Sequence, residues 1–209
     1  MKFVTEKEIS HDFSDERDFS NEDIVMRVLE SGTADDLEKL REHHGFTQEQ
    51  IELFRYYAQL RKQTLDEIRQ DLDERERNNP TPIEDELNMG AYMESIEPQV
   101  QKTVLALRKK GYNTILSGFS GFDGQEIQFA DNKLEEFTLS EELLAEAHSA
   151  GVQIEIKPDA ISFRCERQLP LNELERLWVR IEEDFPDLGE PALASQLRSA
   201  ESFRKRHSS

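Results

Sequence analysis

A helix-strand-strand pattern occurs twice in this chain, and this repeat constrains the fold more than any other feature. In the first copy, the helical stretch Leu105–Gly111 precedes two strand patterns, Tyr112–Ser117 and Gln125–Ala130. Forty residues after Gly111, a second helical stretch ends at Gly151 and leads into the strand patterns VQIEIK and ISFRCE. Strands joined by short connections pair in antiparallel fashion. The repeat predicts an α+β fold in which a two-layer αββαββα domain has a four-stranded antiparallel sheet with helices on one face.

The second hairpin is the best-defined part of this pattern. In Val152–Lys157 and again in Ile161–Glu166, apolar residues alternate with polar ones, which is typical of strands buried on one face only. Pro158 and Asp159 supply the turn between them, because proline presets φ at the first corner of a turn. The alternation places Cys165 on the apolar face, where burial raises the pKa of a thiol and suppresses its reactivity.

The N-terminal part of the chain is acidic and has the pattern of a helical region. Residues 1–97 carry 26 Asp/Glu against 12 Lys/Arg, which accounts for most of the formal net charge of −19. Helical patterns begin after Asn21 and Thr33, both good N-cap residues, and a third follows a capping-box pattern that starts at Thr47. The third helix is expected to span residues 48–77, a length of about 45 Å at about 1.5 Å per residue.

These patterns divide the chain into five segments. The first residues are polar and aperiodic, and the prolines that follow the long helix prevent its continuation. The predicted segments are a flexible acidic arm (1–21), a helical region (22–79), a linker (80–89), the α+β domain (90–188), and a short helix with a basic tail (189–209).

Positions spaced alternately by three and four residues form an apolar seam along the predicted long helix. The seam lasts for three heptads, which is the lower limit for a coiled coil, and Arg61 is its one charged interruption. The two preceding helices are too short to cover a helix of about 45 Å, so we expect the seam to form a homodimer. The candidate interaction residues are Ile51, Phe54, Ala58, Leu65, Ile68 and Leu72.

The most unusual local sequence is SGFSGFDGQ, from Ser117 to Gln125. Its glycines allow backbone conformations closed to other residues, and successive N–H groups can form a nest that binds an anion. The segment leads into a strand instead of a helix, so it matches neither the P-loop nor the dinucleotide-binding fingerprint. It is therefore either a ligand pocket or a hairpin connection whose phenylalanines pack on the sheet. The candidate ligand-binding residues are Ser117, Gly118, Phe119, Ser120, Gly121, Phe122 and Asp123.

Composition and charge disfavour several classes of function. No apolar run approaches the roughly 18 residues that span a bilayer, and the first residues lack the apolar core of a secretory signal, so we expect a cytoplasmic protein without membrane contact. The negative charge repels phosphate backbones, which disfavours direct nucleic-acid binding. The single cysteine excludes an intramolecular disulfide, and His43 and His44 are adjacent, whereas helical ligand pairs are spaced i, i+4. We expect no metal site and no cofactor.

The sequence thus favours a non-enzymatic protein-interaction or regulatory protein that self-associates and binds a protein partner, for which a basic protein would match the acidic charge. Two alternatives stay open. The first is a small-molecule-binding domain or an enzyme that uses the Ser117–Gln125 segment. The second is an acidic mimic of nucleic acid, which would need carboxylates spaced like phosphates along one face.

Overall fold

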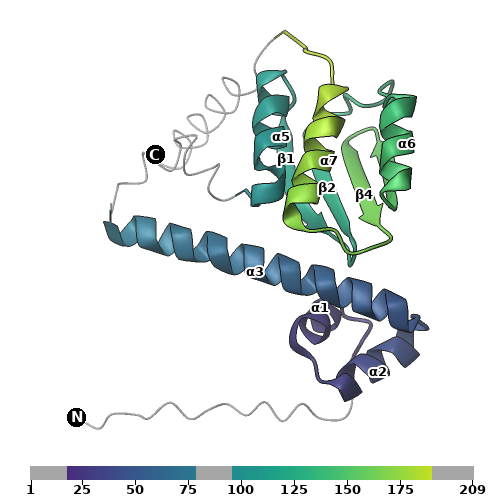
Figure 1. The fold of residues 1–209 in the computed structure, drawn as a ribbon. Coiled ribbons are helices and arrows are strands. Elements are labelled where there is room, and N and C mark those ends of the chain that lie inside the picture. The colour runs from purple at the N-terminus through teal and green to yellow at the C-terminus, as the bar shows by residue number, and fades with distance from the viewer. Residues whose placement is uncertain (1–17, 79–95, 190–209) are drawn as a thin grey trace.

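The structure, a computed structural model, describes residues 18–78 and 96–189 (Figure 1). It confirms the predicted α+β class, because a group of N-terminal helices precedes a domain with a four-stranded antiparallel sheet. Most of the predicted arm, the linker and the predicted C-terminal helix with its basic tail lie outside the described residues. The division of the chain into independent domains stays a prediction.

Three helices form the N-terminal region, and their ends are capped as the sequence predicts. They are α1 (Glu22–Ser31), α2 (Ala34–His44) and α3 (Gln48–Asn78). The Asn21 side chain accepts a hydrogen bond from the backbone N–H of Asp23, and Thr33 forms a capping box with Asp36. Gly45 ends α2 with a φ of 70°, in the left-handed region that favours glycine.

The helices α1, α2 and the first half of α3 share one hydrophobic core, which we call the helical cluster. It includes Phe19 from the predicted arm, so that part of the arm is packed against the helices. The buried members of the helical cluster are Phe19, Val25, Val28, Leu29, Leu37, Leu40, Ile51, Phe54 and Ala58.

The C-terminal part consists of a sheet with three helices on one of its faces (Figure 1). The strands are β1 (Thr114–Ser120), β2 (Gly124–Phe129), β3 (Val152–Lys157) and β4 (Ala160–Cys165), in the order β1-β2-β4-β3. The helices are α5 (Pro98–Lys109), α6 (Glu141–Ser149) and α7 (Leu171–Glu183). All neighbouring strands are antiparallel, as predicted.

The core of this domain, which we call the sheet cluster, lies between the strands and the helices. Ile127 of β2 is paired with Ile161 of β4, and both are fully buried. Trp178 of α7 packs on Phe163 with ring centroids 4.8 Å apart. Cys165 is buried as predicted, and burial raises the pKa of its thiol to about 11. Since side chains alternate between the faces of a strand, the polar residues of β3 and β4 and Glu126 of β2 lie on the opposite, open face, whereas Gln125 of β2 is buried on the core face.

Helix α3 joins the two hydrophobic cores, because it is apolar on two sides. Ile51, Phe54 and Ala58 are buried in the helical cluster, whereas Tyr57 is buried in the sheet cluster. The Tyr57 hydroxyl donates a hydrogen bond to the carbonyl of Arg167 (2.8 Å) and accepts one from a backbone N–H (3.0 Å) in the segment after β4. The first half of the predicted seam is therefore covered within the chain.

The second half of the seam has a different environment. Leu65 and Ile68 are half-buried, and Leu72 belongs to α3 but its side chain is outside those described. The homodimer stays a prediction.

Candidate functional site

The glycine-rich segment is mostly strand, and its turn is shorter than the sequence predicts. Residues 117–120 belong to β1, residues 124–125 belong to β2, and only residues 121–123 form the turn. The glycines at 118 and 124 lie in the strands, where each allows a close approach by another group, instead of in a loop. A Cβ atom at Gly124 would lie 2.9 Å from the carbonyl oxygen of Phe163, on the neighbouring strand.

Gly118 meets the half-buried carboxylate of Glu97, which no sequence pattern indicated. Its φ is 125°, and a Cβ atom there would lie 2.5 Å from the carboxylate of Glu97, the residue before α5. A Glu97 oxygen accepts hydrogen bonds from the backbone N–H of Phe119 (3.0 Å) and from the Gln99 amide (2.7 Å). This N–H of the predicted anion nest is thus bonded to a carboxylate of the same chain.

The surroundings of Glu97 are buried and polar. Burial raises the pKa of its carboxyl group, although the two hydrogen bonds and the charge of Arg61 favour the ionised form. Behind it, the Gln99 amide donates to the side-chain oxygen of Gln125 (3.0 Å), which also faces the indole N–H of Trp178 (3.5 Å). This network connects α5 to β2 and α7. Sequence reasoning missed it because polar residues at a helix start are usually exposed.

The two phenylalanines of the segment point to different cores. Phe119 packs against the sheet cluster, and Phe122, at the tip of the hairpin, packs against the helical cluster. The ring centroid of Phe122 is 5.3 Å from that of Phe54 in α3 and 6.2 Å from that of Phe46. The hairpin tip is therefore a contact between the sheet domain and the N-terminal helices.

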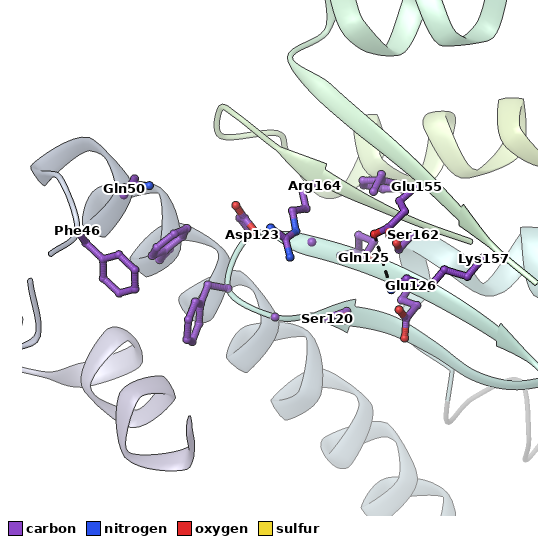
Figure 2. Close-up of a pocket in the computed structure, with 15 residues that line it drawn as sticks. Phe46, Gln50, Ser120, Asp123, Gln125, Glu126, Glu155, Lys157, Ser162 and Arg164 are labelled. Carbon is purple, nitrogen blue, oxygen red and sulfur yellow. Dashed lines mark ion pairs between the residues drawn. The ribbon is translucent and has the colours of Figure 1, made fainter. Parts of the chain in front are cut away.

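A groove of about 520 Å³ lies where this tip meets the open face of the sheet (Figure 2). One end is aromatic and comes from the helical region and the hairpin tip, and the other end is polar and comes from β2, β3 and β4. The lining residues are Phe46, Gln50, Phe54, Ser120, Gly121, Phe122, Asp123, Gly124, Gln125, Glu126, Glu155, Lys157, Ser162, Phe163 and Arg164.

Of the predicted ligand-binding residues, Ser120, Gly121, Phe122 and Asp123 line the groove. Ser117, Gly118 and Phe119 are not among its lining residues. The predicted seam contributes Phe54. The polar side chains on β3 and β4 were recognised only as the solvent-facing half of an alternating pattern, and nothing in the sequence indicates that they meet Phe46.

The charges in the groove are of both signs. On the strand side, Lys157 forms an ion pair with Glu155 at 3.7 Å, and the amide of Gln128 donates a hydrogen bond to Glu126 at 2.6 Å. At the hairpin tip, burial raises the pKa of the Asp123 carboxyl, and the positive charge of Arg164 opposes this rise.

Comparisons with protein-family models, with curated proteins and with solved structures found no match to this chain. None of the helices in residues 18–78 and 96–189 is long and apolar enough to cross a membrane. Over the same ranges, no three His, Cys, Asp or Glu side chains are grouped so that they could hold a metal ion.

The contact between Gly118 and Glu97 predicts unequal effects of alanine at two glycines. Gly121 also has a positive φ, 60°, but a Cβ atom there meets nothing within 4 Å. Gly121→Ala is expected to reduce the free energy of unfolding by about 1–2 kcal/mol, and Gly118→Ala by roughly 2–4 kcal/mol, because strain is added to a clash. Urea unfolding of the two variants measures this difference, and equal losses would contradict the contact.

The raised pKa of Glu97 predicts a pH-dependent effect of Glu97→Gln. An acid with a higher pKa in the folded chain than in the unfolded chain stabilises the fold below its unfolded pKa, and this stability is lost as pH rises through the folded pKa. Relative to wild type, the free energy of unfolding of Glu97→Gln is therefore expected to increase as pH rises above 4.5, the ordinary pKa of a glutamate. Urea unfolding at a series of pH values from below to well above this value tests it, with the exposed Glu142→Gln as a control. The difference in free energy of unfolding between Glu97→Gln and wild type should change with pH, whereas the difference for the control should not. If neither difference changes with pH, burial of the Glu97 carboxyl is contradicted.

Proposed function

We propose that this protein is a non-enzymatic, cytoplasmic interaction protein that binds a segment of a partner protein in the groove beside Phe122. The observation that carries the proposal is the composition of the groove, which combines an aromatic end with a polar strand surface. A protein segment presents apolar side chains, charged side chains and backbone groups together, and an open sheet face beside an apolar patch can bind all three.

The chemistry of the groove supports binding over catalysis. Its hydroxyl groups belong to Ser120 and Ser162, and its lining includes neither histidine nor cysteine. A serine nucleophile needs a base within hydrogen-bond reach. Two of the groove carboxylates interact with cations instead, because the charge of Arg164 acts on Asp123 and Lys157 forms an ion pair with Glu155. These groups suit the recognition of a charged partner.

A small-molecule-binding protein is the second candidate. The groove volume of about 520 Å³ falls within the range of roughly 300–1,000 Å³ that is usual for small-molecule sites. Self-association through Leu65, Ile68 and Leu72 stays a prediction, as does mimicry of nucleic acid by the acidic N-terminal part.

The proposed function is tested by filling the groove without changing either core. Ser162 lies on the open face in the middle of the polar end, and Gln153 lies on the same face but outside the groove. Tryptophan at 162 is expected to block a bound segment, whereas tryptophan at 153 should not.

The measurement is affinity capture from a native lysate with full-length wild type, Ser162→Trp and Gln153→Trp, after thermal unfolding has shown that all three are folded. A partner protein retained by wild type and Gln153→Trp but lost by Ser162→Trp is the expected result. Identical partners for all three proteins would contradict the groove as the binding surface. Loss of a copurified small molecule alone, seen by native mass spectrometry, would favour the second candidate.

A further inference from the structure

The groove has a defined anchor position for an apolar side chain. Phe46 and Phe122 are half-buried and stand at its helical end, with the buried Phe54 beneath them. Aromatic rings that are fixed by edge contacts and still partly open to solvent offer area that a large apolar side chain can cover. An occupant would place one such side chain here.

The other end of the groove has a position for a cation. Glu126 and Glu155 are both in register with Ser162, one on each neighbouring strand, so the three side chains form a row across the open face. With strands about 4.8 Å apart, the two acids are roughly 10 Å apart across the row. A lysine or arginine side chain above Ser162 would therefore lie between two carboxylates.

The cations already in the groove do not neutralise this position. Lys157 contacts Glu155, but the two side chains are 47% and 63% exposed, and an ion pair at 3.7 Å between exposed groups is weak. Arg164 is two residues from Ser162 and its charge acts on Asp123. Three acids against two cations leave an excess of negative charge in the groove, and the chain as a whole carries −19, which attracts a basic partner.

The geometry of the sheet sets the spacing between the two positions. The row of Ser162 lies two residues from the pair of Gly124 and Arg164, and Phe122 lies just beyond that pair. At about 3.4 Å per residue, this separation is roughly 10–13 Å, or three to four residues of an extended peptide.

We infer that the groove binds an extended basic segment of a partner protein, with a large apolar residue against Phe46 and Phe122 and a lysine or arginine three to four residues away, above Ser162. The inference rests on the proposed function and specifies its partner. The apolar contact supplies most of the affinity, and the paired carboxylates select the sign of the charge and the spacing.

The test is selection of peptides from a random library displayed on phage, with immobilised full-length protein and counter-selection against Ser162→Trp. The expected consensus contains one Phe, Trp, Leu, Ile or Met and a Lys or Arg three or four positions away. An acidic consensus, or one without a cation, would overturn the inference but would leave groove binding, and hence the proposed function, in place. Recovery of no peptide that depends on residue 162 would also overturn it, whereas lysate capture decides the proposed function separately.

Charge variants of the protein provide the second measurement. Glu126→Gln/Glu155→Gln is expected to weaken binding of the selected peptide at least tenfold in fluorescence anisotropy and to reduce its dependence on salt. The control, Glu135→Gln/Glu136→Gln, removes the same charge from exposed positions outside the groove and should change affinity less than twofold. Equal weakening by both double variants would show that only net charge matters and would overturn the proposed cation position.

Discussion

The structure depends on the packing of Phe122 against Phe46 and Phe54. The N-terminal helices and the sheet have separate hydrophobic cores, and this side chain extends from the sheet into the helical one. Tyr57 makes the reciprocal connection, because it belongs to α3 but is buried in the sheet cluster. Phe122 reaches from the sheet into the helical cluster and Tyr57 reaches from α3 into the sheet cluster, so together they hold the helices against one end of the sheet. Aromatic packing suits this role because it is both apolar and directional.

The groove is a consequence of this arrangement. The polar open face of β2, β3 and β4 forms one side of the groove, and the hairpin tip and the helices form the other. Glu97, the residue before α5, supports the hairpin through its contact with β1. Its carboxylate bonds to the backbone next to Gly118 and fixes β1 near the tip, and its burial ties this contact to the protonation state of one group. The position of Phe122 therefore depends on contacts on both sides of β1.

Local patterns predicted the elements of this fold but not the contacts between them. The alternation in β3 and β4, the caps at Asn21 and Thr33 and the span of α3 follow from short-range rules, and the structure agrees with them. The first half of the apolar seam of α3 is buried in the helical cluster, but the sequence alone does not decide whether such a seam meets other helices or a second chain. The glycine-rich segment was harder to predict, because glycine is typical both of turns and of places where another group approaches the backbone closely. At residue 118 the position of Glu97 shows that the glycine allows a close approach.

The most direct test of this account is a double-mutant cycle between Phe54 and Phe122, measured by urea unfolding of full-length protein. If Phe122 joins the two cores, Phe54→Ala and Phe122→Ala are expected to be non-additive, with a coupling energy of about 0.5–1.5 kcal/mol. The same cycle between Phe122 and Phe185, which is buried in the sheet cluster, should give additive losses. Additivity within about 0.3 kcal/mol for Phe54 and Phe122 would contradict the contact on which the groove depends.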